Sequence, residues 1–225
     1  MRAAVVSMLV IGGFGGFGCG GAQSGTGDER ADTPRETCPE SIPEPIPPEP
    51  KSFDWWVDRA SACPSGTQLE GSAPPFGEEV WCETSDGTRR GPWTWWYGEG
   101  RKISDGSYNA DGEPDGEWVA WHENGNRKMQ GTYVNGQKHG RWTMWHENGE
   151  PSTDIRFEHG LQHGTWSWWY ESGNKAGEGE FSNDKPHGKW IRCSDEGYIT
   201  KVEMYDNDKL VDWIDYDDGH RIVER

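Results

Sequence analysis

A glycine that recurs at a nearly constant interval constrains this fold more than any other feature. The interval is 25 residues once and 24 residues three times, over Gly91, Gly116, Gly140, Gly164 and Gly188. A tryptophan follows two residues after each glycine: Trp93, Trp118, Trp142, Trp166 and Trp190. Five residues after the glycines lie Trp96, Trp121, Trp145, Trp169 and, in the last unit, Cys193. Such regularity predicts a stack of similar units, each packed against its neighbours.

Each unit carries the turn signals of a β-hairpin. Asn124-Gly125 and Asn148-Gly149 separate aromatic segments and are typical of type I′ turns, in which both central residues have positive φ. A second turn pair, such as Asn135-Gly136, follows about eleven residues later. Two tight turns per unit leave room only for short strands. The sequence therefore predicts an all-β chain, an elongated antiparallel meander of stacked β-hairpins with a 24-residue period.

The expected turns also predict which residues face one another. Trp118 lies opposite Gly131 if Asn124 and Gly125 form the loop, so that the ring covers a glycine of the facing strand. Two further ring–glycine pairs follow: Trp93 with Gly106, and Trp166 with Gly179. The second tryptophans face other residues, Lys128 for Trp121 and Ser152 for Trp145.

The two tryptophans of a unit are three residues apart, so they point to opposite faces of a regular strand. Because the second set lacks glycine partners, it is the candidate binding surface: Trp96, Trp121, Trp145 and Trp169. These rings could dock a protein partner, since tryptophan is enriched at interface hot spots. They could instead stack on the sugar rings of a glycan, or only pack against one another.

The pattern G-x-W-x-x-W, followed by N-G, G-x-Y and another N-G, resembles bacterial variants of the MORN repeat over about residues 63 to 217. The resemblance implies a twisted sheet of β-hairpins that serves as a scaffold for protein contacts. Some members of this variant are described as antitoxins of toxin–antitoxin systems, so an antitoxin-like inhibitor of a toxin is an alternative function. Classical members have been linked to phospholipid headgroups.

The N-terminus has the pattern of an export signal over residues 1–18. Arg2 precedes an apolar run, 3–11, that is shorter than the roughly 20 residues of a membrane span. Gly18-Cys19 resembles a bacterial lipobox, which predicts lipidation at Cys19 and an outer-membrane lipoprotein of the cell envelope. Cleavage after Ala22, giving a secreted or periplasmic protein, is the alternative.

Four further segments are expected after the signal. A Pro-rich tether spans 19–51, an N-terminal cap 52–90, five MORN-like hairpin repeats 91–211, and a C-terminal cap 212–225.

The cysteines are expected to form disulfides, because an exported chain meets an oxidising compartment. Cys63 and Cys82 lie close in sequence and are predicted to pair. Cys38 and Cys193 form the additional predicted pair, reached if the Pro-rich arm runs along the sheet. The sequence has no C-x-x-C spacing, so it does not indicate a zinc site.

Charge and motif content argue against catalysis and against polyanionic partners. The chain has 22 Lys and Arg against 39 Asp and Glu, a formal charge of −17, which repels nucleic acid and anionic lipid. The repeated His139, His163 and His187 occupy equivalent positions two strands apart, about 10 Å, which is too far to share a metal. We therefore expect a non-catalytic binding protein with a protein partner, a possible glycan ligand, no cofactor and no metal.

Overall fold

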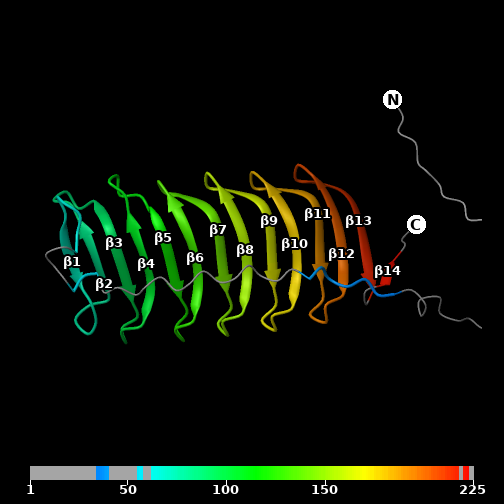
Figure 1. The fold of residues 1–225 in the computed structure, drawn as a ribbon, viewed down its shortest axis with the longest axis horizontal. Coiled ribbons are helices and arrows are strands. Elements are labelled where there is room, and N and C mark those ends of the chain that lie inside the picture. The colour runs from blue at the N-terminus through cyan, green and yellow to red at the C-terminus, as the bar shows by residue number, and fades with distance from the viewer. Residues whose placement is uncertain (1–33, 41–54, 58–61, 218–219, 223–225) are drawn as a thin grey trace, which may run out of the picture. The chain divides into compact units, whose positions relative to one another are not determined.

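A single antiparallel sheet contains every strand that the computed structural model describes, in residues 34–40, 55–57, 62–217 and 220–222. Its fourteen strands lie side by side in chain order (Figure 1). They are β1 (Gln68–Ser72), β2 (Glu79–Glu83), β3 (Arg89–Trp96), β4 (Lys102–Tyr108), β5 (Gly116–Trp121), β6 (Arg127–Val134), β7 (Gln137–Trp145), β8 (Pro151–Glu158), β9 (Leu161–Trp169), β10 (Lys175–Ser182), β11 (Lys185–Cys193), β12 (Ile199–Asp206), β13 (Lys209–Asp217) and β14 (His220–Ile222). The predicted all-β meander is confirmed. None of the described segments forms a helix long and apolar enough to cross a membrane.

The two ends of the hairpins use different turns. Asn135 and Gly136 have φ values of 48° and 77°, so this pair forms the two-residue type I′ turn. At the opposite end Gly125 has a φ of 90°, but Asn124 is not in the left-handed region. The prediction of a type I′ turn at Asn124-Gly125 is therefore wrong.

A longer turn forms at Asn124-Gly125, closed by two backbone hydrogen bonds and one side-chain hydrogen bond. Gly125 N donates to His122 O at 2.9 Å, and His122 N donates to Asn126 O at 2.8 Å, which closes a three-residue loop with a left-handed glycine. The side-chain Oδ1 of Asn124 accepts a hydrogen bond from Asn126 N at 2.9 Å. This local bond favours the observed loop.

The longer turn shifts the register beside it by one residue. Trp118 faces Gly131 as predicted, but Trp121 faces Arg127 instead of Lys128. Lys128 is the extra residue of a β-bulge. Trp145 likewise faces Pro151, with Ser152 as the extra residue.

Adjacent repeats are joined by the same side-chain hydrogen bonds at the same period. His122 Nε2 lies 2.9 Å from Trp145 O, and His146 Nε2 lies 2.9 Å from Trp169 O. Tyr170 takes the same place in the next repeat, where its hydroxyl donates to Cys193 O at 2.7 Å. These histidines therefore satisfy backbone carbonyls between repeats.

Both predicted disulfides are formed. Cys63 and Cys82 join the segment before β1 to β2, with a Cα–Cα distance of 5.6 Å. Cys38 and Cys193 join residues 155 apart in sequence. Cys38 N donates to Gly197 O at 2.9 Å. This bond holds the segment 34–40, which is blue in Figure 1, beside β12.

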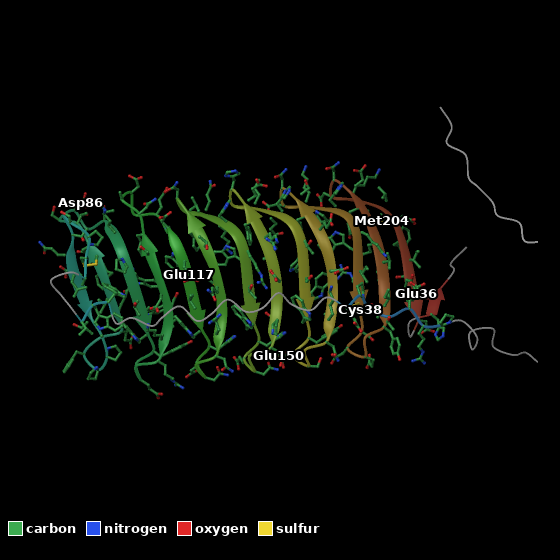
Figure 2. The ribbon with its side chains drawn as sticks, in the orientation of Figure 1. Glu36, Cys38, Asp86, Glu117, Glu150 and Met204 are labelled. Atoms are coloured by element: carbon green, nitrogen blue, oxygen red, sulfur yellow. A yellow bond between two sulfur atoms is a disulfide. The ribbon has the colours of Figure 1, made fainter. Side chains whose placement is uncertain are left out.

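The structure changes two of the expected boundaries. Residues 34–40 fall inside the predicted tether, yet Ile199 N donates to Glu36 O at 3.0 Å and Tyr216 donates to the Glu36 carboxylate at 3.0 Å. Figure 2 shows Glu36 and Cys38 at this end of the sheet. At the other boundary, β13 runs through residue 212, so the predicted C-terminal cap begins inside a strand of the sheet. The predicted signal peptide and the predicted lipidation site, Cys19, lie outside the described residues.

Candidate binding surface

Two columns of tryptophan run along the sheet. We call Trp93, Trp118, Trp142, Trp166 and Trp190 the first column, and Trp96, Trp121, Trp145 and Trp169 the second column. Within a strand the two columns point to opposite faces, because their members are three residues apart. The faces are named below after the column that they carry.

The second column is not the open surface that the sequence predicts. Trp145 is only 4% exposed, Trp96 and Trp169 are also buried, and Trp121 is half-buried. The Trp56 ring packs against Trp96 with centroids 4.8 Å apart. The prediction that these rings are free to meet a ligand is therefore wrong for the three buried ones.

Cations cover the middle of the second column. The Arg127 guanidinium lies 5.3 Å from the centre of the Trp145 ring, and the Lys102 ammonium lies 5.8 Å from that of Trp121. Both distances allow a cation–π interaction. Arg127 reaches Trp145 from the strand in which the bulge has changed the expected register. The sequence pattern did not reveal these contacts, because each joins a strand of one repeat to a strand of the next.

The first column is held by glycines that lie between successive hairpins. Gly131 faces Trp118 across its own hairpin, but a Cβ added to Gly131 would overlap the ring of Trp142 from the next hairpin. The same relation joins Gly106 to Trp118 and Gly179 to Trp190. The ring that covers each glycine is therefore that of the following repeat, which corrects the prediction that the facing ring of the same hairpin covers it.

The column is interrupted where the glycine is replaced. Ile155 takes that position opposite Trp166. Trp166 instead lies 4.6 Å from Trp168, between ring centroids, at a tilt of 33°. Its buried Nε1, like that of Trp190, has no acceptor among the described residues. By contrast, Trp142 Nε1 donates to Thr132 O at 3.2 Å.

Smaller aromatic rings fill the spaces between the tryptophans of the first column. The Tyr133 ring lies 5.5 Å from Trp118 and 4.9 Å from Trp142, in edge-to-face contacts. Burial in this stack raises the pKa of the Tyr133 hydroxyl. In each of these contacts the edge of one ring meets the face of the other.

Part of the first-column face is accessible. Trp118, Trp166 and Trp168 are half-buried, and Trp95 is 41% exposed. Trp95 and Trp168 lie two residues after Trp93 and Trp166, so they share this face. Partly exposed rings on a rigid sheet offer apolar area for recognition without a large loss of conformational entropy.

Cys193 and the backbone of Glu147 and Glu171 have structural partners. Cys193 is in a disulfide, so it is not a free thiol. The backbone carbonyls of Glu147 and Glu171 accept hydrogen bonds from Asn124 and Asn148 of the preceding repeats, each at 2.6 Å. In the described residues, no group of three or more His, Cys, Asp or Glu side chains is arranged to hold a metal.

A pair of histidines forms a contact that the repeat pattern does not predict. The rings of His139 and His159 lie 6.2 Å apart and line an open pocket of about 360 Å³ with Asn135 and Lys138. The period does not reveal this pair, because the two histidines occupy non-equivalent positions of the repeat.

The hairpin stack, its glycine-seated rings and its bulged turns define an all-β repeat protein. Within this class, the family model described as MORN repeat variant matches residues 114–135, 138–159 and 162–183. The matches start 24 residues apart and cover β5 to β10 with their turns. The middle of the chain is thus similar to MORN repeat variants, as the resemblance predicts.

Other comparisons add little. No match to a curated protein was found. Among solved structures, a chain in the crystal structure of accessory secretory protein 1,2 and 3 in Streptococcus pneumoniae is 15% identical over 64% of this chain. This chain spans only 19% of the length of that one, and the TM-score is 0.16. Nothing about function follows from this similarity.

Proposed function

We propose that this protein is a non-catalytic scaffold of the cell envelope that binds a protein partner on its first-column face. The observation that carries the proposal is the row of accessible aromatic rings on that face, which includes Trp95, Trp118 and Trp168. Aromatic residues are enriched in the cores of protein interfaces. A toxin that this chain inhibits would be one such partner.

The packing of the central rings around Tyr133 favours a protein over a glycan. Sugars stack on the flat faces of aromatic rings, whereas the Tyr133 ring stands edge-to-face between Trp118 and Trp142. Trp118 and Tyr133 are inclined by 75°, and Tyr133 and Trp142 by 81°. A protein side chain can pack against the remaining edges as well as against faces.

The proposed location is the envelope, with Cys19 as the lipidated residue. The two disulfides support export, because such bonds persist in oxidising compartments. The high negative charge is compatible with this location, since attachment would rest on the acyl chains rather than on attraction to anionic lipid.

The test is capture of a partner from envelope extract by the full chain and by surface variants. Trp95→Ala and Trp168→Ala should each weaken capture of the same protein at least tenfold. Leu161→Ala is the matched control, since Leu161 is exposed at the start of β9, beside the His159-Gly160 turn. Circular dichroism should show that all three variants remain folded. Unchanged capture by both tryptophan variants, or binding of oligosaccharides but no protein, would overturn the proposal.

A further inference from the structure

Two histidine rings line the same open notch at one edge of the sheet. His139 lies near the start of β7, and His159 is the first residue of the two-residue turn between β8 and β9. Both side chains are exposed, and the centres of their rings are 6.2 Å apart. The notch that they line with Asn135 and Gln137 has a volume of about 360 Å³. It is large enough for an ion with its bound water.

The backbone fixes the positions of the two histidines. His159 has a φ of 50° and Gly160 a φ of 82°, which close a type I′ turn. Gly160 N donates to Lys138 O at 3.0 Å, so the turn is bonded to the residue before His139. The two Cα atoms are therefore held in place, and only the rings need to turn toward a ligand.

His159 departs from the repeat pattern. Three other described hairpins carry asparagine at its place in the turn: Asn135, Asn183 and Asn207. All four residues have φ values between 47° and 52°, so this turn accepts either side chain. In the next unit, His163 and Asn183 occupy the positions of His139 and His159. Two imidazoles therefore meet where the next unit supplies one.

The separation of the two rings suits a single metal ion. A metal bonded to an imidazole nitrogen at about 2.1 Å lies about 3.3 Å from the ring centre, so one ion can join rings whose centres are up to about 6.5 Å apart. The observed 6.2 Å lies within this limit. Imidazole binds Cu²⁺, Ni²⁺ and Zn²⁺, and a given site generally holds Cu²⁺ most tightly of these.

The two rings are free to act as ligands. Neither forms a hydrogen bond or an ion pair with the residues that the structure describes, whereas the rings of His122 and His146 are engaged by backbone carbonyls. A metal would therefore not have to displace a partner from either imidazole.

The charge around the notch favours a cation. The Lys138 ammonium lies 4.6 Å from the ring centre of Trp142 and 5.0 Å from that of Phe157. It is thus held against the first-column face, whereas His139 is the next residue in the strand and points to the other face. Glu158 adds a negative charge one residue before the turn, and the total charge of −17 attracts cations to the protein.

We propose that His139 and His159 bind one divalent transition-metal ion, Cu²⁺ in first place, with water completing its coordination. The 24-residue spacing separates equivalent histidines by two strands, but this pair joins non-equivalent positions. The ion would connect β7 to the turn that follows β8. The inference goes beyond the proposed function and does not depend on Trp95 or Trp168.

The test titrates the full chain with CuCl₂ at neutral pH and measures binding by calorimetry. We expect one strong site in the wild type, with which MgCl₂ does not compete, because Mg²⁺ prefers oxygen ligands. His139→Ala should weaken binding at least tenfold. His159→Asn, which introduces the residue of the other turns, should do the same.

Two further variants use the repeat itself as a control. His187→Ala should bind Cu²⁺ normally, since His187 occupies the position equivalent to His139 but belongs to the unit with Asn207 in its turn. Asn183→His should create a second site of similar affinity beside His163. Circular dichroism should show that all four variants remain folded.

Four results would each overturn the proposal. Unchanged Cu²⁺ binding by His139→Ala or by His159→Asn would place the ion elsewhere. Equal weakening by His187→Ala would show diffuse binding to surface histidines, and the absence of a second site in Asn183→His would show that two histidines in these positions do not form one. Binding of inorganic phosphate but not of Cu²⁺ to the wild type would identify an anion site instead.

Discussion

The indole of Trp142 lies directly against the Cα of Gly131, and only a hydrogen fits between them. Gly131 is in β6 and Trp142 is in β7, and the two residues belong to successive 24-residue units. Trp142 is completely buried. The glycine therefore contributes by the absence of a side chain, which lets one repeat seat the ring of the next.

Gly131→Ala should destabilise the protein because the new methyl group would overlap the Trp142 indole. The φ of Gly131 is not positive, so the expected loss of about 1–3 kcal/mol comes from overpacking alone. Gly98→Ala is the control, because its added Cβ would meet only the flexible end of Glu78. Urea unfolding of both variants checks this, and a loss no larger than in Gly98→Ala would show that the ring has room to move.

Trp145→Ala should cost about as much stability as Trp142→Ala, roughly 3–5 kcal/mol for truncation of a large buried ring. The sequence alone predicts a small effect at Trp145, whereas its 4% exposure places it in the core. Thermal unfolding compares the two variants, with Trp95→Ala as the exposed control. Near-wild-type stability of Trp145→Ala would contradict the observed burial.

Removal of the two disulfides should have unequal effects. The chain-entropy estimate for loops of 19 and 155 residues gives about 3 kcal/mol for Cys63–Cys82 and about 5 kcal/mol for Cys38–Cys193. The double variant Cys38→Ser/Cys193→Ser should therefore unfold at lower denaturant than Cys63→Ser/Cys82→Ser. The reverse order in guanidinium titrations would refute this prediction.

Alkaline pH should weaken the fold in part through Tyr133. Burial raises the pKa of this hydroxyl above its unfolded value. Between the two values the native state holds a proton that the unfolded state has lost, so stability falls as pH rises from about 10. Tyr133→Phe should lose less stability than the wild type between about pH 9 and about pH 11, measured by urea unfolding. Identical pH profiles would exclude this contribution.

Cys19→Ser should release the protein from membranes if Cys19 carries the lipid, because acyl chains supply the affinity at about 0.8 kcal/mol per buried CH₂. Fractionation of cells that express each form measures the shift. Mass spectrometry of the wild type should find the acyl groups, and a soluble, unlipidated wild type would reject the anchor and favour cleavage after Ala22.

The sequence by itself determined the period, the fold class and the pairing of Trp118 with Gly131. These follow from short-range rules, since tight turns close hairpins and side chains alternate between faces. It also indicated both disulfides, because the cysteines were few and export narrowed their chemistry. The prediction of a type I′ turn at Asn124-Gly125 was wrong. An Asn-Gly pair is compatible with a two-residue and with a three-residue loop, and the backbone hydrogen bonds of His122 close the three-residue loop.

Only the tertiary structure decided which surface is accessible. The ring on Gly131 comes from the next hairpin, and Trp96 is covered by Trp56, forty residues earlier in the chain. Likewise, only the structure shows that Trp213 faces Glu203 and that its ring is exposed. The burial of a side chain depends on which segments meet in space. A periodic sequence pattern describes one repeat unit and does not say which other segments cover its side chains.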